Sequence, residues 1–540
     1  MTRSHLTMEF SVSDLVAAVA CAIGFGILYS ILLAAYRLLF HPLSKYPGPL
    51  TAKVSGLYGA FYASRTTLHL RTWQDHVRYG PIVRHGPNKL VFNSIQALRS
   101  IYQNDRITKS RSYLVSQRAP GIYGLFNAVD KTIHQKKRRL VGQPLSDKSL
   151  RAFEPVMIGQ IDIFIQQLLR SCRTKGRDAV PINMTNQSKY LTMDVMGYLA
   201  FGYPLNLQTE ATNRVMAHST ANFFFNIGLQ LPFLGSFRVW TLRSLRSLIR
   251  GKRYLQSLEK VIIQRLAEGQ HVKHDLLFMS DSLRVSEDNQ VWLDEIRSEA
   301  IWFLIAGSDT TSTTLSALFF YLTRNPDCYQ RLAREIRSTF SDGSEIYSGP
   351  RLASCSYLRA CIDETLRMSP ALPGTLWREK AAGVSPSEPL VIDGRIIPEG
   401  TQLGVNTYAL LHNEEYFPSP FTFKPERWLD PESNQASREA FAPFSLGSRS
   451  CLGKSMAYLE VSLVMAKTLL QLDFDEAPGV RGAHLTRLSE KELGKGTERV
   501  KEFQMYDMFA AAHDGPFLKF RPAGEDIKTL YTVVEEHDHE

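Results

Sequence analysis

The sequence predicts a mainly α-helical protein with small β-sheets, in which one large domain follows an N-terminal membrane-spanning helix. Apolar residues recur with the period of a helix over long stretches, whereas stretches with strand-like alternation are short. A long uncharged apolar stretch precedes all of them. The chain has 540 residues, of which 44% are apolar and 21% charged, and this composition is typical of a globular rather than a disordered protein.

The uncharged stretch runs from Leu15 to Tyr36. At about 1.5 Å per residue, a helix of this length crosses a hydrocarbon core ~30 Å thick. A cleaved signal peptide is the alternative, but its apolar region usually has about 7–15 residues and ends at a small-residue cleavage site, whereas this stretch continues to Arg37. More basic residues follow the stretch than precede it, so the positive-inside rule places the bulk of the chain in the cytoplasm. We expect a short lumenal N-terminus over 1–14 and a single-pass anchor over 15–36.

The rest of the chain divides into three parts. Residues 37–50 contain Tyr46-Pro47-Gly48-Pro49, whose prolines exclude helix and predict a stiff linker. Residues 51–523 contain no repeat and no break of linker length, so they are expected to form a single domain. Residues 524–540 form an acidic tail with two histidines, for which metal binding is possible but a solvated segment is the simpler interpretation.

Within the domain, apolar periodicity predicts five long helices. They cover Ser149–Leu169, Gln187–Phe201, Leu242–Glu268, Leu293–Thr323 and Asp327–Phe340. Strand-like stretches are predicted at Ile82–Phe92, Leu390–Val405 and Phe517–Phe520.

The six cysteines form no CxxC pair and no regular ladder of spacings. Neither a disulfide framework nor a zinc ribbon is therefore expected, in agreement with a reducing compartment. The net charge of +10 is compatible with nucleic acid, anionic lipid or an acidic protein partner, and by itself it does not distinguish them.

One cysteine, Cys451, lies in a segment with distinctive spacing. The segment from Phe444 to Gly453 contains Gly447, Arg449 and Cys451, and an apolar-periodic helix is predicted from Lys454 onward. A thiolate at the start of a helix is stabilised by the backbone N–H groups, which also tune its electron donation to a metal. Gly447 and Gly453 permit close approach of a flat macrocycle, and Arg449 offers a charged fork to a carboxylate of that macrocycle. An inert buried cysteine is the simpler alternative for any one of these residues taken alone.

The segment from Phe444 to Gly453 resembles the haem-binding motif of the cytochrome P450 superfamily at every specified position. The resemblance extends from the anchor to about Pro522 and implies the P450 fold, with haem b (iron protoporphyrin IX) as cofactor and Cys451 as the axial thiolate ligand of its iron. The Tyr-Pro-Gly-Pro linker and the segment Tyr79–Asn88 resemble fungal microsomal members that tailor secondary metabolites.

A second similarity lies in Ala306-Gly307-Ser308-Asp309-Thr310-Thr311, within the long helix that begins near Leu293. The Thr310 hydroxyl can bond to the carbonyl of Ala306 four residues earlier, and Gly307 leaves room for a small ligand such as dioxygen. The resemblance makes Thr310 the hydrogen-bonding relay and Asp309 the acid that supplies protons, and it places Ala306 beside the cofactor. The alternative is an N-cap at Ser308 or Asp309 that starts a separate helix.

A third similarity concerns the pair Glu364 and Arg367, whose i, i+3 spacing puts both on one face of a helix. The resemblance implies that the pair is buried and closes a structural network with Arg427. A fourth concerns His134 and Arg138, which share a helix face by their i, i+4 spacing and are implied to bond haem propionates. Arg378 is a further propionate partner by resemblance.

The run Lys136–Arg139 is basic. A solvated helix face and a docking site for an acidic electron donor are both compatible with it, whereas the anchor argues against a nuclear signal or nucleic-acid binding. No GxGxxG follows a predicted strand, so the chain is expected to have no flavin or NADPH site of its own. The resemblance implies a separate NADPH-cytochrome P450 reductase as electron donor, with cytochrome b5 as a second candidate.

The sequence therefore predicts a haem-thiolate monooxygenase of the endoplasmic reticulum membrane that hydroxylates or epoxidises a lipophilic small molecule. Alternatives are a P450-type catalyst of rearrangement, dehydration or oxidative coupling, a haem-binding protein without turnover, and an anchored interaction protein without haem. The resemblance places the apolar substrate pocket against five segments. They are Ser112–Asn127, Phe223–Phe233, Ile301–Ala306, Leu372–Leu376 and Met508–Ala511.

Overall fold

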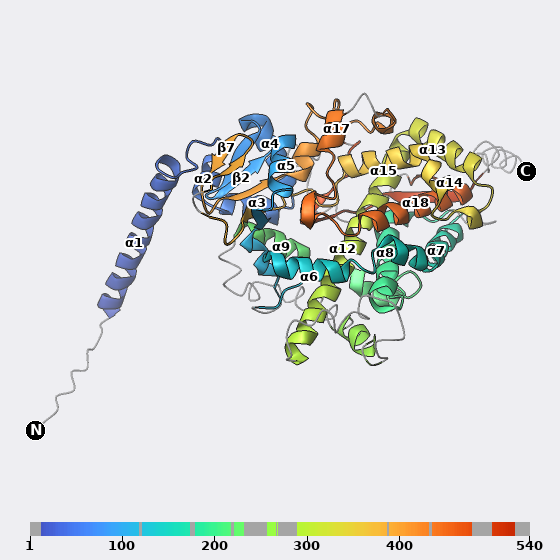
Figure 1. Cartoon of the computed structure of the whole chain (residues 1–540), viewed down its shortest axis with the longest axis horizontal. Coiled ribbons are helices and arrows are strands. Elements are labelled where there is room, and N and C mark those ends of the chain that lie inside the picture. Colours follow the sequence, from blue (N-terminus) through green and yellow to red (C-terminus); the bar gives the residue numbers. More distant parts are fainter. Residues whose placement is uncertain are drawn as a thin grey trace, which may run out of the picture.

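The computed structural model describes residues 12–117, 121–172, 179–217, 221–231, 256, 258–265, 267, 289–385, 388–430, 435–477, 499 and 501–523. Helices form most of this part of the chain and small sheets complete it, so the predicted fold class is confirmed. Figure 1 shows α1 projecting from one end of the body and α12 running through its middle. The expected tail 524–540 and residues 1–11 of the expected lumenal N-terminus lie outside the described residues.

The helices are α1 (Val12–Leu39), α2 (Leu50–Val54), α3 (Leu57–Ser64), α4 (Leu68–Tyr79), α5 (Ile95–Tyr102), α6 (Lys131–Val141), α7 (Asp147–Arg170), α8 (Met184–Phe201), α9 (Ala221–Gln230), α12 (Asn289–Arg324), α13 (Pro326–Thr339), α14 (Pro350–Ser354), α15 (Ser356–Met368), α16 (Thr407–Leu411), α17 (Gln435–Ala440) and α18 (Lys454–Gln471). The strands are β1 (Ile82–Gly86), β2 (Lys89–Phe92), β3 (Ile107–Lys109), β4 (Ile182–Asn183), β5 (Arg378–Lys380), β6 (Leu390–Ile392), β7 (Arg395–Ile397), β8 (Gln402–Val405), β9 (Leu472–Glu476), β10 (Tyr506–Met508), β11 (Ala510–Ala512) and β12 (Phe517–Pro522).

Four of the predicted helices are confirmed as α7, α8, α12 and α13. Of the prediction Leu242–Glu268, residues 256, 258–265 and 267 are helical and the remainder lies outside the described residues. The stretch Ile82–Phe92 is a hairpin of β1 and β2 rather than one strand, and Leu390–Val405 divides into β6, β7 and β8. Asp393 and Gly394 both have positive φ between β6 and β7, which is the backbone that a two-residue hairpin turn requires.

The sheets bring residues together that are far apart in the sequence. The five-stranded sheet has the order β1-β2-β8-β5-β3, in which β2 and β8 are parallel. Its edge pairs β3 with β5, so that Lys109 lies opposite Arg378. A second sheet has the order β4-β12-β9, and β10 pairs with β11 in a hairpin. The sheet edge thus contributes two basic side chains to one location.

Close packing of α8 against α12 holds the central helix in place. Thr192 donates its hydroxyl to the Ser308 carbonyl at 3.1 Å, and Ser316 donates to the Met184 carbonyl at 3.3 Å. At Gly307, a Cβ atom would overlap the thioether of Met196. Met196 therefore fills the space on the side of the missing side chain, whereas Gly307 itself lines the cavity described below, so the expectation that it leaves room for a small ligand stays a prediction.

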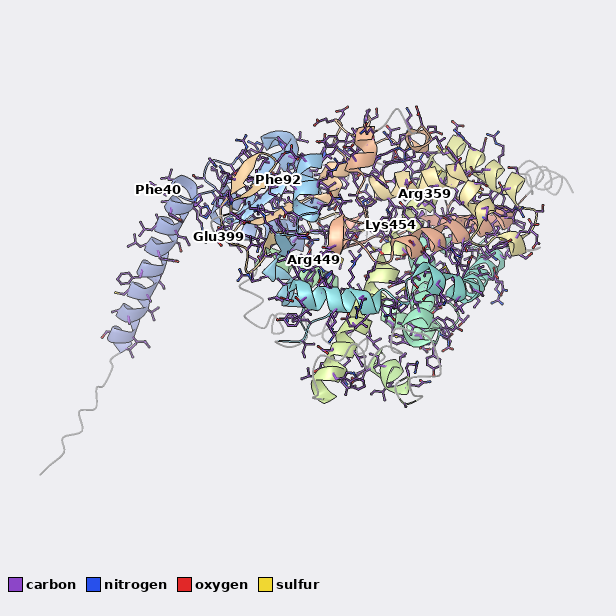
Figure 2. All side chains as sticks on the ribbon, viewed as in Figure 1. Phe40, Phe92, Arg359, Glu399, Arg449 and Lys454 are labelled. Atoms are coloured by element: carbon purple, nitrogen blue, oxygen red, sulfur yellow. The ribbon has the colours of Figure 1, made fainter. Side chains whose placement is uncertain are left out.

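The residues after α1 attach the helix to the body. The stretch Leu15–Leu39 is long and apolar enough to cross a membrane, and Figure 2 shows its side chains standing clear of the body, with Phe40 at its end. Arg37 donates to the Val54 carbonyl at 2.6 Å, and Arg84 donates to the Arg37 carbonyl at 2.8 Å. Leu43 is buried in the core beside the five-stranded sheet. The segment after α1 is thus packed onto the body.

Candidate active site

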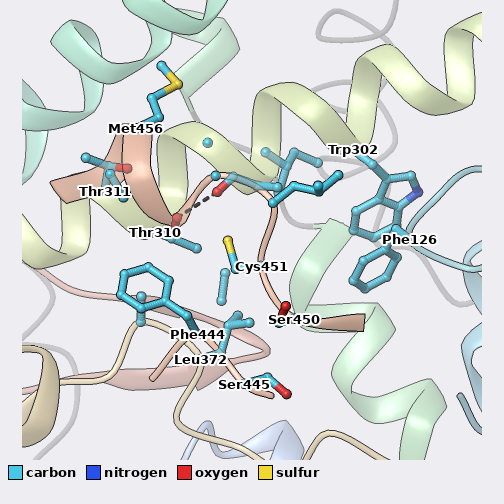
Figure 3. Close-up of a pocket in the computed structure, with 18 of the residues that line it drawn as sticks. Phe126, Trp302, Thr310, Thr311, Leu372, Phe444, Ser445, Ser450, Cys451 and Met456 are labelled. Atoms are coloured by element: carbon cyan, nitrogen blue, oxygen red, sulfur yellow. Dashed lines mark hydrogen bonds between the residues drawn. The ribbon is translucent and has the colours of Figure 1, made fainter. Parts of the chain in front are cut away.

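A cavity of about 320 Å³ lies between α12 and the loop that precedes α18. Figure 3 shows Cys451, Thr310 and Phe444 close together among the side chains that line it. All three side chains line the cavity, together with Ala306, Gly453 and Arg449. The structure therefore brings the residues of two separate sequence motifs to one site.

The Cys451 loop owes its shape to a tight turn. Gly447 has φ +72°, and a Cβ atom there would overlap the Tyr102 carbonyl, so glycine is required on both counts. The Cys451 N–H donates to the Phe444 carbonyl at 2.9 Å, which closes the loop and leaves the side chain exposed to the cavity. Gly453 precedes the first residue of α18, so the sulfur lies at a helix N-terminus as predicted. Burial raises the pKa of the Cys451 thiol, and the Gly453 N–H and Arg138 act in the opposite direction.

The opposite wall is the middle of α12. The Thr310 hydroxyl donates to the Ala306 carbonyl at 2.7 Å, so the predicted bond is confirmed (Figure 3). The helix is continuous from Asn289 to Arg324, which makes the alternative of a separate helix starting at Ser308 or Asp309 wrong. A hydroxyl that bonds to a carbonyl one turn back stays beside the helix axis and faces the cavity from a fixed position.

Asp309 points elsewhere. Its carboxylate forms an ion pair with Lys189 of α8 and is not among the described residues that line the cavity. Burial lowers the pKa of Lys189 to about 7. The sequence analysis missed Lys189, and no local signal marks it, because the partner lies on another helix.

Basic side chains gather at one end of the cavity. Arg449 donates to the carbonyls of Ala128 (2.6 Å) and Val129 (2.9 Å), and Arg138 donates to the Ser450 carbonyl at 2.7 Å. Burial, and then the neighbouring Arg378, lower the pKa of Arg449 to about 10. The basic residues that line this end are Lys109, His134, Arg138, Arg378 and Arg449. Lys109 was not predicted, although its place opposite Arg378 follows from the sheet register.

Lys109, His134 and Arg378 complete this basic group. Burial and Arg449 hold the pKa of both Lys109 and His134 well below their ordinary values. Arg378 donates to the Trp377 carbonyl at 3.1 Å and lies 4.9 Å from the Tyr102 ring centroid. Since these groups disfavour one another's charged forms, an anionic ligand at this end would be stabilised by all of them.

The predicted network around Glu364 is confirmed. Arg367 donates to both carboxylate oxygens at 2.9 Å, and Arg427 donates to one of them at 3.0 Å. The Trp428 indole N–H and the Lys424 backbone N–H also donate to the Glu364 carboxylate, each at 3.0 Å. Burial alone would raise the pKa of Glu364, but the two arginines lower it below its ordinary value.

The basic run Lys136–Arg139 does not form one exposed surface. Lys136 and Arg139 are exposed, whereas Lys137 is buried in an ion pair with Glu299 at 3.0 Å and Arg138 lines the cavity. Both original interpretations, a solvated face and a docking patch for the whole run, therefore need correction. A helix exposes only part of its circumference to solvent, so four consecutive residues cannot share one surface. Here Lys137 and Arg138 face the interior, where they contact Glu299 and the cavity.

Aromatic residues line the end of the cavity toward the start of α12. The rings of Phe126 and Trp302 stack with centroids 4.0 Å apart (Figure 3), and Tyr113 and Phe509 also line the cavity. Four of the five predicted lining segments contribute residues. In the fifth segment, residues 225–231 do not line it, and the side chains of residues 223 and 224, like residues 232 and 233, lie outside the described part.

Glu460 is a further residue that the sequence analysis missed. It lies on α18, lines the cavity and is 1% exposed, and within the described part of the chain its Oε1 atom has no hydrogen-bond partner. Burial raises its pKa to about 8, so the carboxyl is protonated at neutral pH. A single glutamate in an apolar helix gives no sequence signal that separates it from an exposed one.

The model of the cytochrome P450 family matches residues 47–495. The chain belongs to this family. The monooxygenase apf7 of Gibberella fujikuroi is 33% identical over 91% of this chain and 96% of its own length. The monooxygenase atnE of Emericella nidulans is 33% identical (96% and 99%), and AKT7 of Alternaria alternata is 34% identical (95% and 99%). All three are named cytochrome P450 monooxygenases, and this P450 is accordingly an oxidoreductase of the monooxygenase class.

The P450 family implies a haem-thiolate cofactor, and the described residues fit one. Cys451 presents a thiol to the cavity from a helix N-terminus, where donors favour the thiolate. The basic group at one end matches the two carboxylates of a protoporphyrin, because arginine forks bind carboxylates well. Donor type and charge distribution therefore agree with the cofactor of this P450.

Proposed function

We propose that this P450 hydroxylates or epoxidises a lipophilic small molecule in fungal secondary metabolism. Cys451 is the axial ligand in this proposal, Arg138, Arg378, Arg449 and His134 hold the propionates, and Phe444, Gly447, Gly453 and Ala306 line the macrocycle. Lys109 also binds the propionates in this proposal. The observation that carries the proposal is that Cys451 and Thr310 line one cavity with a basic group at its end.

When bound, the haem supplies O₂ activation and transfer of one oxygen atom, with two electrons delivered from outside. The protein's own residues perform three other tasks. The aromatic residues exclude water from the substrate, the basic group orients the cofactor, and the hydroxyl of Thr310 holds a proton at the cavity wall. Asp309 passes protons toward this position from its ion pair with Lys189, whose ammonium supplies them. Glu364, Arg367 and Arg427 stabilise the fold beneath the Cys451 loop.

The electron donor in this proposal is a separate NADPH-cytochrome P450 reductase, with cytochrome b5 as a second candidate. Such donors are acidic, and the exposed Lys136 and Arg139 of α6 offer them opposite charge. Residues 15–36 anchor the chain in the endoplasmic reticulum membrane, and residues 37–50 connect this anchor to the haem domain. The haem domain, residues 51–523, faces the cytoplasm. This orientation is supported by the exposed apolar helix and by the basic residues that follow it.

The test is the difference spectrum of reduced, CO-treated microsomes that express the chain. The wild type is expected to give the red-shifted band of a thiolate-ligated haem, and the Cys451→Ala variant to lose it. Cys328→Ala is the matched control, because this half-buried cysteine of α13 does not line the cavity. Haem-free but folded wild-type protein contradicts the proposal. A positive band leads to assays of substrate-dependent NADPH and O₂ consumption with added reductase.

A further inference from the structure

Phe225 of α9 lies behind the aromatic wall of the cavity rather than in it. It is 5% exposed, and its ring contacts four of the aromatic residues that line the cavity. The centroid distances are 5.7 Å to Tyr113, 5.3 Å to Phe126, 5.9 Å to Trp302 and 4.8 Å to Phe509. Edge-to-face contacts of this kind fix the relative orientation of rings. A shift of Phe225 therefore moves the whole wall.

The residue after Phe225 ties α9 to the β10–β11 hairpin. Asn226 donates its amide N–H groups to the backbone carbonyl and to the Oδ1 atom of Asp507, both at 3.0 Å. Both side chains are buried, so the bonds are shielded from water. An amide side chain is suited to this task, because its two N–H groups can serve two acceptors at once.

Asp507 also shapes the opposite half of the wall. Its Oδ1 atom accepts the backbone N–H of Phe509 at 3.2 Å. Phe509 has φ +77°, a backbone that a non-glycine residue adopts only when its surroundings hold it there. The Asp507 N–H in turn donates to the Thr66 carbonyl at 2.7 Å. One carboxylate thus connects the element that carries Phe225 with the turn that carries Phe509.

A second contact fixes the end of α9. Lys89 of β2 donates its ammonium to the Leu229 carbonyl at 2.6 Å and lies 3.3 Å from the Gln230 amide oxygen. A cation at the carboxyl end of a helix is favourably placed. Because α9 is held both at Asn226 and at its end, rotation of Phe225 away from the wall is restricted.

We propose that Asn226 and Asp507 are positioning residues that set the substrate specificity of this P450, by holding Phe225 and Phe509 in the aromatic wall. The proposal rests on the proposed haem site, since it concerns the shape of the cavity above that cofactor. Substrates with a flat aromatic or conjugated portion are the ones that such a wall selects. Neither residue lines the cavity, so both act through the rings.

The test uses haem-loaded full-length protein and two iron-binding probes, imidazole and 4-phenylimidazole, titrated by their spectral shifts. Imidazole binds through the iron alone, whereas the phenyl group of 4-phenylimidazole must also pack against the aromatic wall of the cavity. Asn226→Asp keeps the side-chain shape but loses donors and adds a charge beside Asp507, and Asn226→Leu keeps a similar side-chain volume and removes both donors without adding a charge. Both are expected to weaken 4-phenylimidazole binding about tenfold and imidazole binding less than twofold. Asn213→Asp is the matched control, since Asn213 bonds to the Leu205 carbonyl outside the cavity.

A double variant distinguishes positioning from general loosening. If Asn226 acts through Phe225, then Phe225→Leu reproduces the change in the binding ratio of the two probes, and adding Asn226→Asp changes it no further. Equal weakening of both probes, or an unchanged ratio, overturns the proposal. If the wild type binds neither probe and gives no CO band, the proposed function itself fails and this inference falls with it; an intact CO band with an unchanged ratio overturns only the inference.

Discussion

The carboxylate of Asp309 is paired with the ammonium of Lys189, across the interface between α12 and α8. Burial lowers the pKa of Lys189 to about 7. Below this pH the lysine is charged and holds Asp309, and above it the pair loses its cation. If the pair takes part in proton delivery, turnover is expected to fall as the pH rises through about 7.

The Lys189→Arg variant tests this expectation. A guanidinium stays protonated over the whole range, so the fall in turnover should move to higher pH. Lys189→Met should give low turnover with no inflection near pH 7. The measurement is product formed per NADPH consumed between pH 6 and 9, with the CO band as a measure of intact protein. Identical pH profiles for wild type and Lys189→Arg would contradict the role of the pair.

Removal of the Thr310 hydroxyl should uncouple electron use from product formation. Thr310→Val keeps the side-chain shape but cannot hold a proton at the Ala306 carbonyl, so product per NADPH is expected to fall by about 10²-fold while NADPH oxidation continues. Thr310→Ser retains the hydroxyl and is the control. Peroxide and product are measured together. Loss of NADPH oxidation in step with product would instead indicate a structural defect.

The Glu364 network should dominate stability near the Cys451 loop. Glu364→Gln leaves Arg367 and Arg427 buried without their carboxylate, and breaking a buried pair in this way costs about 3–5 kcal/mol. We expect a large fall in the temperature at which the haem absorbance is lost. Glu345→Gln, which removes an exposed ion pair with Arg351, is expected to change this temperature little. Similar temperatures for both variants would contradict the prediction.

Because of Glu460, the free energy of unfolding should fall as the pH rises toward 8. Its pKa is raised from 4.5 to about 8 by burial, so its contribution to folding is most favourable below pH 4.5 and is lost as the pH rises to about 8. The loss is about 1.4 kcal/mol per pH unit over this range. Glu460→Gln should therefore unfold at a higher temperature than wild type at pH 8, with a smaller difference at pH 5.5. The exposed substitution Glu476→Gln serves as control, and an equal difference at both pH values argues against this titration.

The features that follow from the residues themselves, rather than from the family resemblance, are those formed within one element or one short motif. The Thr310 bond and the Glu364–Arg367 pair follow from helical spacing, and the Cys451 loop follows from its glycines and the helix after it. The features missed join elements far apart in the chain. Neither the Asp309 ion pair with Lys189 nor the bond between Asn226 and Asp507 has a local pattern, because the packing of whole helices brings these residues together.

Two expectations are modified for the same physical reason. Gly307 lines the cavity, but whether the space on the side of its missing Cβ is open depends on the neighbouring helix, and here Met196 fills it. The basic run of α6 was expected to act as a unit, but the curvature of the helix surface divides it, and Lys137 turns inward to Glu299. In both cases the residue type suggested a role, but residues on neighbouring elements determined whether the space or the charge was available.

The hydrogen bonds around Arg37 limit how the body moves on its anchor. Arg37 and Arg84 connect the end of α1 to α2 and to β1 through two backbone carbonyls, and Leu43 is buried directly after them. A helix attached in this way transmits its own tilt to the domain instead of acting as a free tether. Any membrane that α1 crosses therefore meets one face of the body, and this face stays at a constant distance from the lipid.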